Sequence, residues 1–170
     1  MPELIRPSVA YKDSYLAALQ EFQAEDRLLD LDPAWLRANF PVFVRKLLDR
    51  ENPDKVPPGF SPETVLWLVE GEEFLGRVSI RHQLVGTLSV WGGHIGYEIR
   101  PSARRKGYGT LGLRLALPWA RQLGLGRVLV TCDKSNVGSR KIIEANAGVL
   151  ESEVRVEGHA QPKLRFWIEL

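Results

Sequence analysis

The sequence lacks several features that would by themselves point to a class of protein. It has one cysteine, Cys132, which excludes an internal disulfide framework and a cysteine-based zinc site, so we expect no bound metal. Its 23 basic and 21 acidic residues leave a net charge of +2, too near balance to indicate a nucleic-acid partner. No apolar run approaches the ~20 residues of a membrane span, and the first six residues do not resemble a signal peptide. We therefore expect a cytoplasmic protein without a membrane partner.

The rest of the composition is that of an ordinary globular protein. Apolar residues make up 44% of the chain and charged residues 26%. A chain of this length has room for one sizeable core, and no internal repeat divides it. We expect a single domain over residues 1–170.

Segments typical of strands and helices follow one another in an order that predicts a mixed sheet. Apolar or alternating runs predict strands at residues 4–6, 64–70, 74–82, 94–100, 127–132, 149–156 and 164–170. Helical spacing predicts helices at 12–25, at 32–48 with a break at Pro41, at 107–123 with a kink at Pro118, and at 136–147. This order favours antiparallel and parallel pairing in one sheet.

One segment between an expected strand and an expected helix has the chemistry of a phosphate site. It reads Ile99-Arg100-Pro101-Ser102-Ala103-Arg104-Arg105-Lys106-Gly107-Tyr108-Gly109-Thr110. Basic residues at a helix N-terminus oppose the helix dipole, so their gathering there is explained by a bound anion. Backbone N–H groups of residues 105–110 would line the site, and the two glycines would allow close approach. The alternative is that the glycines and basic residues only start the helix.

The spacing Gly107-x-Gly109-x-x-Gly112 also matches the dinucleotide-binding fingerprint. In that fold the glycines follow the strand at once, and repeated strand–helix units build a doubly wound sheet. Here residues 101–106 intervene, and such units are too few. A nicotinamide-binding protein is therefore a minor alternative.

Two segments together resemble a known family. Arg104-x-x-Gly107-x-Gly109, preceded by Ile99-x-Pro101, resembles the coenzyme A pyrophosphate loop of the GCN5-related N-acetyltransferases, the GNAT superfamily. The segment from Asn136 to Gly148 is similar to the part of that family in which an asparagine after the next strand helps to bind coenzyme A. The run from Gly92 to Tyr97 resembles a poorly characterised subgroup of predicted acetyltransferases.

The resemblance implies a fold and a cofactor. The fold is an α/β (α+β), GNAT-like, mixed and mostly antiparallel twisted sheet of six to seven strands, with a parallel splayed central pair and about four flanking helices. The co-substrate is acetyl-CoA, whose pantetheine arm lies between the splayed strands. The implied cofactor-binding residues are Ile99, Arg100, Arg104, Arg105, Lys106, Gly107, Tyr108, Gly109, Thr110, Asn136, Ser139 and Arg140.

The implied reaction is attack of an acceptor amine on the acetyl thioester. An alkyl ammonium with a pKa near 10.4 must lose a proton first, so a base is needed. Glu98 and His94 are the candidate catalytic residues, on one face of the strand at 94–100 and roughly 13 Å apart along it. Many family members have a tyrosine general acid in the later helix, where this chain has Ile142 and Ile143.

The sequence thus predicts an acyl-CoA-dependent N-acetyltransferase acting on a primary amine. The missing tyrosine keeps a non-catalytic acyl-CoA-binding or sensor module as the alternative. The acceptor is a small-molecule or peptide amine, and an acidic stretch from Glu21 to Asp32 would suit its positive charge. The oligomeric state is open, with a homodimer among the alternatives.

Overall fold

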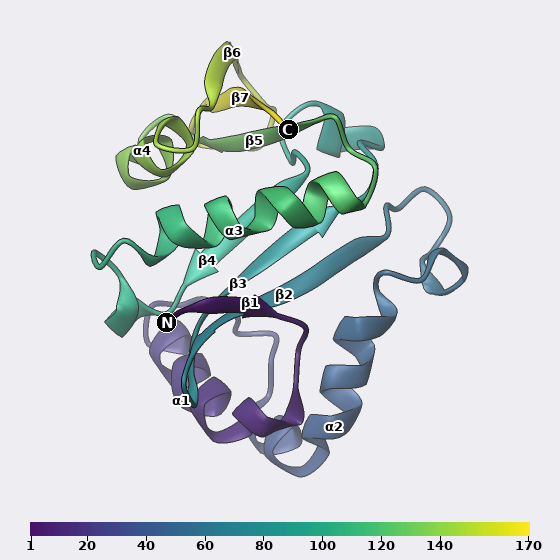
Figure 1. The fold of residues 1–170 in the computed structure, drawn as a ribbon, viewed down its shortest axis with the longest axis vertical. Helices are drawn as coiled ribbons and strands as arrows, with labels where there is room; N and C mark the ends of the chain where they lie inside the picture. Colours follow the sequence, from purple (N-terminus) through teal and green to yellow (C-terminus); the bar gives the residue numbers. More distant parts are fainter.

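A computed structural model describes residues 1–170 (Figure 1). Four α-helices are present: α1 (Lys12–Gln23), α2 (Pro33–Asp49), α3 (Tyr108–Gln122) and α4 (Val137–Glu144). The strands are β1 (Glu3–Ile5), β2 (Glu63–Glu70), β3 (Glu73–Arg81), β4 (Ile95–Ile99), β5 (Arg127–Asp133), β6 (Val149–Val154) and β7 (Lys163–Glu169). The predicted order of strands and helices is confirmed.

The strands form two antiparallel sheets that meet at one place. The first has the order β1-β2-β3-β4 and the second the order β5-β7-β6. Strands β4 and β5 run in the same direction, because α3 carries the chain back between them (Figure 1). They touch through the backbone N–H of His94, which donates to the carbonyl oxygen of Leu129 at 2.7 Å. The expected parallel, splayed pair is therefore present, but it joins two sheets.

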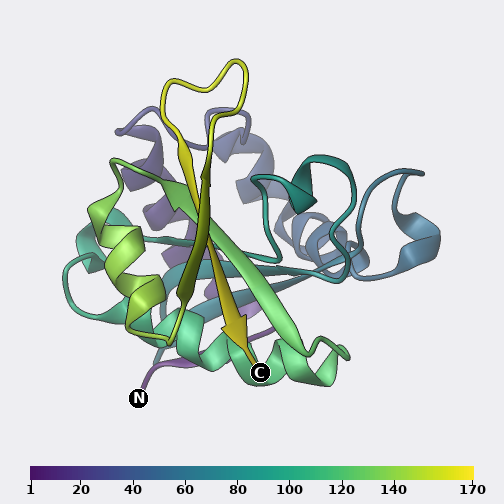
Figure 2. The same ribbon diagram turned by 90° about the horizontal axis from the view of Figure 1, so that it is seen from above.

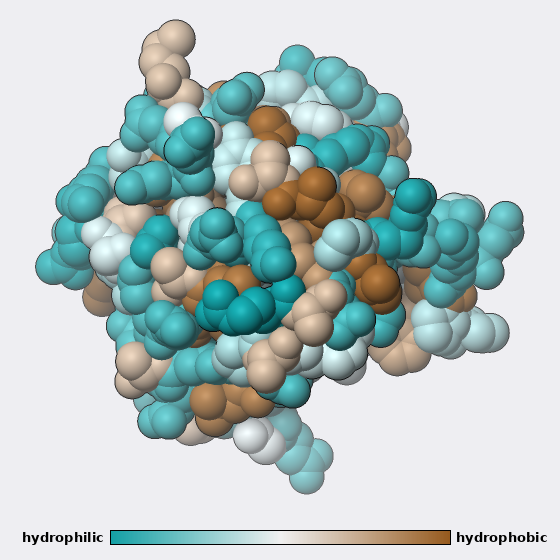
Figure 3. Space-filling view, turned by 90° about the horizontal axis from the view of Figure 1, so that it is seen from below, coloured by the Kyte–Doolittle hydropathy of each residue, from teal (hydrophilic) through white to brown (hydrophobic).

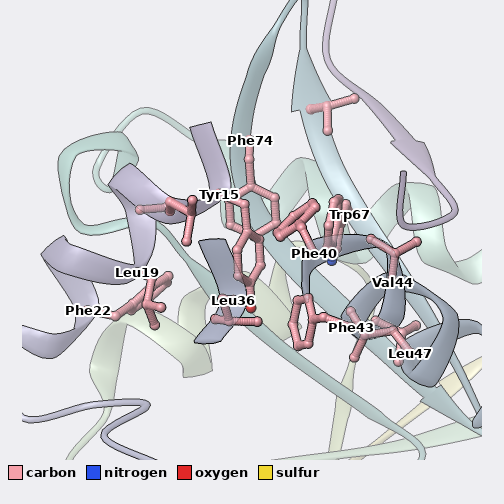
Figure 4. Close-up of a cluster of buried hydrophobic side chains, with 14 residues drawn as sticks. Tyr15, Leu19, Phe22, Leu36, Phe40, Phe43, Val44, Leu47, Trp67 and Phe74 are labelled. Carbon is pink, nitrogen blue, oxygen red and sulfur yellow. The ribbon is translucent and has the colours of Figure 1, made fainter. Parts of the chain in front are cut away.

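Helices cover both faces of the first sheet. Alternation along β2 sends Val65, Trp67 and Val69 toward α1 and α2, where they join a cluster of 14 buried residues. Figure 4 shows the aromatic rings of this cluster gathered between the helices and the sheet. Leu66 points the other way, into a second cluster of 14 buried residues shared with α3, α4, β5 and β7. Because successive side chains of a strand point to opposite faces, β2 contributes residues to both clusters.

Two local predictions differ from the structure in detail. Helix α2 continues through Pro41, and the irregularity falls at Asn39, whose φ of −126° and ψ of 28° are not helical. Proline lacks the N–H that the helix needs, so the turn before it is distorted. Helix α4 ends at Glu144, three residues before the predicted end at 147, and Ala147 adopts the left-handed conformation with φ 62°. No helix is long and apolar enough to cross a membrane.

Candidate active site

A gap between β4 and β5 is closed at one end and open at the other. At the closed end, His94 makes two bonds to Leu129: its N–H donates to the carbonyl oxygen at 2.7 Å, and its Nδ1 accepts the Leu129 N–H at 2.9 Å. No ladder pairing joins the two strands beyond this point. At the open end, β4 leads into the loop 100–107 at the start of α3, and β5 ends at Asp133. The gap is therefore lined by free strand edges.

Gly93 allows the strands to approach at the closed end. Its φ is +70°, and a Cβ at this position would lie 2.7 Å from the carbonyl oxygen of Leu129. Only glycine combines that backbone conformation with so close a contact. The closed end therefore depends on the residue just before His94.

The His94 ring is buried, with 6% of the residue exposed. Since Nδ1 accepts an amide proton, the neutral ring carries its own proton on Nε2. Burial lowers the pKa of His94, and the nearby Arg81 lowers it further. Such a ring has no free nitrogen lone pair with which to accept a proton from an amine. The sequence suggested His94 as a candidate base, but in the structure its Nδ1 lone pair is taken up by the Leu129 N–H.

The loop 100–107 presents a row of free backbone donors. Arg105 and Gly107 have positive φ angles of 63° and 84°, which turn successive N–H groups toward one side. None of the N–H groups of residues 105–110 has an acceptor within the protein. The row continues into the first turn of α3, where the helix dipole adds positive potential. This arrangement is suited to phosphate oxygens.

The basic side chains of the loop fall into two groups. Arg104 forms two bonds with Glu25, at 2.9 and 2.8 Å, and a third with the carbonyl oxygen of Ile99. Arg100 pairs with Glu21 at 2.7 Å. Arg105 and Lys106 are exposed, and neither takes part in an ion pair. The first group ties the loop to α1, and the second is free to meet an anion.

Helix α4 begins beside the open end. Asn136 is its N-cap, with its side-chain oxygen accepting the Ser139 N–H at 3.0 Å. The Ser139 hydroxyl lies 2.8 Å from the Tyr97 hydroxyl of β4, so two hydroxyl groups span the gap between the strand and the helix. Burial raises the pKa of Tyr97 to about 12, which keeps its proton in place. Arg140 pairs along the helix with Glu144.

Three further contacts fix α3 against its neighbours. The Gly109 position is so close to Ile142 that a Cβ would lie 2.6 Å from the end of that side chain. The Thr110 carbonyl oxygen accepts from the side chain of Asn146, a buried residue that sequence reasoning missed. The Tyr108 hydroxyl donates to Glu70 at 2.9 Å. Among the predicted cofactor residues, Tyr108 thus directs its hydroxyl toward β2.

Glu98 lies on the other face of β4, toward α1. Its side chain is 11% exposed and accepts from Arg27 at 2.8 Å and from Arg77 at 2.9 Å. Arg77 is its cross-strand neighbour on β3. Arg27 comes from the turn after α1, between Asp26 and Leu28, which both have positive φ. Sequence reasoning missed both arginines, since only strand register and the path of that turn bring them to Glu98.

A small cavity of about 80 Å³ lies beside Glu98. Its walls are mostly apolar, and its polar lining residues are Asp30, Arg50, Arg77 and Glu98. Seen from the side on which α1 and α2 lie, the surface has hydrophobic patches between hydrophilic residues (Figure 3). This face thus offers both apolar and charged contacts near the Glu98 carboxylate. No group of three or more metal-ligating side chains gathers in the structure.

Known proteins resemble this chain in sequence pattern and fold. The family model described as "Acetyltransferase (GNAT) domain" matches residues 19–148. No curated protein sequence matches the chain. Among solved structures, the microcin C7 self-immunity acetyltransferase MccE, in complex with acetyl-CoA and AMP, is 14% identical with a TM-score of 0.68, covering 99% of this chain and 92% of that one.

Two other solved structures have the same fold. RimL, a ribosomal L7/L12 alpha-N-protein acetyltransferase in complex with coenzyme A, is 16% identical with a TM-score of 0.66, covering 99% of this chain and 94% of that one. RimJ of Mycobacterium smegmatis, in complex with CoA-disulfide, is 18% identical with a TM-score of 0.68, and the match covers 98% of this chain and 80% of that one. At these identities the likeness shows the fold.

Proposed function

The chain belongs to the GNAT family of acetyltransferases, and we propose that it transfers the acetyl group of acetyl-CoA to a primary amine by direct attack on the thioester. The acceptor is a small-molecule or peptide amine. The main support is the row of six free backbone N–H groups at residues 105–110, placed where the gap between β4 and β5 opens. The pyrophosphate of coenzyme A fits this row of N–H groups, and its extended pantetheine arm fits the gap between the strands.

In this proposal the cofactor is bound chiefly by backbone groups. The N–H groups of Arg105 to Thr110 bind the pyrophosphate, aided by the exposed side chains of Arg105 and Lys106. The pantetheine arm lies along the free edge of β4 near Ile99, and the Asn136 amide contacts it from the start of α4. Arg100 and Arg104 act indirectly, because their pairs with Glu21 and Glu25 hold the loop in shape.

We propose Glu98 as the group that receives the amine and takes up its proton, directly or through a water molecule. It is the carboxylate on the α1 side of β4, beside the cavity of about 80 Å³. An incoming ammonium group would compete with Arg27, which comes from a turn and is 46% exposed at its side chain, for one carboxylate oxygen. His94 is given a positioning role at the closed end, since its Nδ1 is bonded to Leu129.

The hydroxyl pair of Tyr97 and Ser139 can donate a hydrogen bond to the departing thiolate. It lies on the α4 side of β4, whereas Glu98 lies on the α1 side, so this donor and the base are on opposite faces of the strand. This arrangement gives the chain a donor although α4 has no tyrosine. The thiolate of coenzyme A needs little assistance to leave, so we expect the pair to contribute modestly.

A panel of primary amines with acetyl-CoA, followed by release of free thiol, tests the proposal. We expect amine-dependent release, and Glu98→Gln should lower kcat about 100-fold with the KM for acetyl-CoA within a factor of about three. The matched control is Glu3→Gln, on the strand at the far edge of the first sheet from β4.

Two outcomes separate the alternatives. Full activity of Glu98→Gln across pH would rule out Glu98 as the base. Binding of coenzyme A without thiol release from any amine would favour the non-catalytic acyl-CoA-binding module. Circular dichroism of the variant checks the fold, because Glu98 also pairs with Arg27 and Arg77.

A further inference from the structure

A second cavity, larger than the one beside Glu98, lies away from the gap, at the ends of β2 and β3 nearest the closed end. Its volume is about 690 Å³. It is bounded by the end of α2, by the proline-rich segment after α2, and by the segment between β3 and β4. Figures 1 and 2 both show these two segments side by side beyond the strand ends. The cavity is large enough for a small molecule or a few residues of a peptide.

The lining of this cavity has an excess of positive charge. Six charged residues line it, and two of its basic residues are neutralised: Lys55 by Asp49 at 2.8 Å and Arg50 by Glu63 at 2.8 Å. The other two basic residues, Lys46 and Arg81, take part in none of the ion pairs. Both carboxylates of the lining are thus already paired, and two cations are left without a carboxylate partner.

Arg81 is held in a fixed position by the backbone. One of its terminal nitrogens donates to the carbonyl oxygens of Gly92 and Gly93 at 3.1 and 3.2 Å. Both terminal nitrogens lie within 3.8 Å of the place where a Cβ would stand on Gly96. The guanidinium therefore lies over the middle of β4. Its other N–H groups have no acceptor within the protein.

The position of Arg81 relates the cavity to the candidate active site. Gly96 and Glu98 are two residues apart on β4 and share one face, so their Cα atoms are separated by about 7 Å. Glu98 lines the smaller cavity and Arg81 lines the larger one, and Arg50 lines both, so the two cavities adjoin and a molecule that extends from one into the other would contact both groups. Burial lowers the pKa of Arg81, and the nearby Glu63 carboxylate, which is already paired with Arg50, offsets this only in part. An anion at this point would restore the balance and form charge-assisted hydrogen bonds.

We propose that the acceptor carries an anion, a carboxylate or a phosphate, a few bonds from its amine, and that Arg81 and Lys46 bind this anion in the cavity. The inference rests on the proposed acetyl transfer and specifies the acceptor of that reaction. The amine lies at Glu98, and the anion lies toward α2. A zwitterionic small molecule and a peptide with an acidic residue beside its N-terminus share this chemistry.

Matched pairs of acceptors test the inference on the unmodified protein. The pairs are 4-aminobutyrate with butylamine, 3-aminopropylphosphonate with propylamine, and the dipeptide amides Met-Glu and Met-Gln. At saturating acetyl-CoA we expect kcat/KM to be about 10- to 100-fold higher for the anionic member, the range for a hydrogen-bonded charge pair. A preference seen in the first two pairs indicates a free small molecule as acceptor, and a preference seen in the third pair indicates a peptide.

Variants then assign the preference to residues. Arg81→Gln should lower the ratio of kcat/KM for the anionic acceptor to kcat/KM for its neutral partner about 10- to 100-fold. Lys46→Gln should have a smaller effect in the same direction. Arg45→Gln is the matched control, because Arg45 is exposed on α2 and does not line the cavity.

The outcomes distinguish this inference from the proposed function. Acetylation of both members of every pair at equal rates would overturn the inference and leave the acetyltransferase activity intact. Failure to acetylate any amine would count against the activity itself. In that case calorimetric binding of 3-aminopropylphosphonate to the coenzyme A-saturated protein, lost in Arg81→Gln, would still support the anion site, and no binding would end it. If Arg81→Gln does not fold, the comparison of pairs on the wild type decides.

Discussion

At the scale of single residues, the basic cluster at 100–106 has two roles that the sequence presents as one. Arg100 binds Glu21 of α1 and Arg104 binds Glu25 of the turn after it, about 80 positions earlier in the chain, at 2.7 and 2.8 Å. The acidic stretch that suggested a wall for a cationic acceptor is thus partly used to hold the loop. Which carboxylate meets which arginine depends on how α1 packs, and local sequence does not contain that information.

His94 shows the same limit of sequence reasoning. Its place on a strand face could be predicted, and its pKa range made it a reasonable candidate base. The bond from the Leu129 N–H to Nδ1 joins residues 35 positions apart and decides the tautomer. A residue predicted for chemistry can therefore serve to join two strands.

The His94 ring gives the protein a pH dependence of stability. Burial lowers the pKa of both His94 and His82 in the folded state, so the unfolded chain binds more protons once the pH falls below about 6.5. We expect the free energy of unfolding to decrease between pH 7.5 and pH 5.5. His94→Asn, whose side-chain oxygen can accept the Leu129 N–H, should reduce that decrease. Urea unfolding at both pH values measures it.

The control for this prediction is His82→Asn, which should remove only the contribution of His82. Carboxylates with lowered pKa values, such as Glu21 and Glu151, titrate below this window and do not interfere. An unchanged pH dependence in His94→Asn would mean that the ring is not held neutral by its burial.

At the scale of elements, β4 and β5 are held together only where His94 bonds to Leu129, and they belong to different sheets beyond that point. Periodicity predicted β4, α3 and β5 in the right order, since strand and helix periods differ clearly in these segments. It did not predict that the single sheet would divide in two, because hydrogen bonding between strands leaves no local pattern. In the sequence, Gly93 stood out only as part of a run that resembles other predicted acetyltransferases, and its close approach to Leu129 gives it a structural role.

Gly93→Ala should therefore open the closed end. The new Cβ would lie 2.7 Å from the Leu129 carbonyl oxygen, so one of the strands must move. We expect the free energy of unfolding to fall by about 1–3 kcal/mol more than in the control, and the KM for acetyl-CoA to rise. Chemical denaturation and steady-state kinetics measure the two effects.

The control is Gly158→Ala, in the loop between β6 and β7. Its φ is +79°, close to the +70° of Gly93, but nothing lies within 4 Å of the added carbon. The two variants share the strain of a left-handed alanine and differ in the contact with the backbone. Equal losses of stability would mean that the close approach at Leu129 contributes nothing.

At the scale of the whole molecule, the two sheets form a wedge whose free edges face each other across the gap. One hydrophobic cluster packs α1 and α2 against the first sheet, and another, which includes residues of α3 and α4, joins the first sheet to the second. The loop 100–107 is connected to α1 through the pair of Arg100 with Glu21, and Gly109, in the first turn of α3 after the loop, contacts Ile142 of α4. Sequence could predict this loop because the glycines and basic residues are contiguous. It could not predict the Arg27–Glu98–Arg77 group or the Arg81 cavity, which come from distant segments.

A ligand that contacts both the loop and the gap should stabilise the whole wedge. Coenzyme A at 100 times its Kd contributes about 2.7 kcal/mol to the free energy of unfolding. For a chain of 170 residues this corresponds to a rise in Tm of about 5–10 °C. NAD has a pyrophosphate for the loop but no arm to lie between β4 and β5, so it should give a much smaller rise at the same concentration. Thermal unfolding with each ligand measures the difference, and pantetheine alone is the control for the arm. A larger shift with NAD than with coenzyme A would mean that the glycine spacing serves a dinucleotide and that the gap is not a cofactor site.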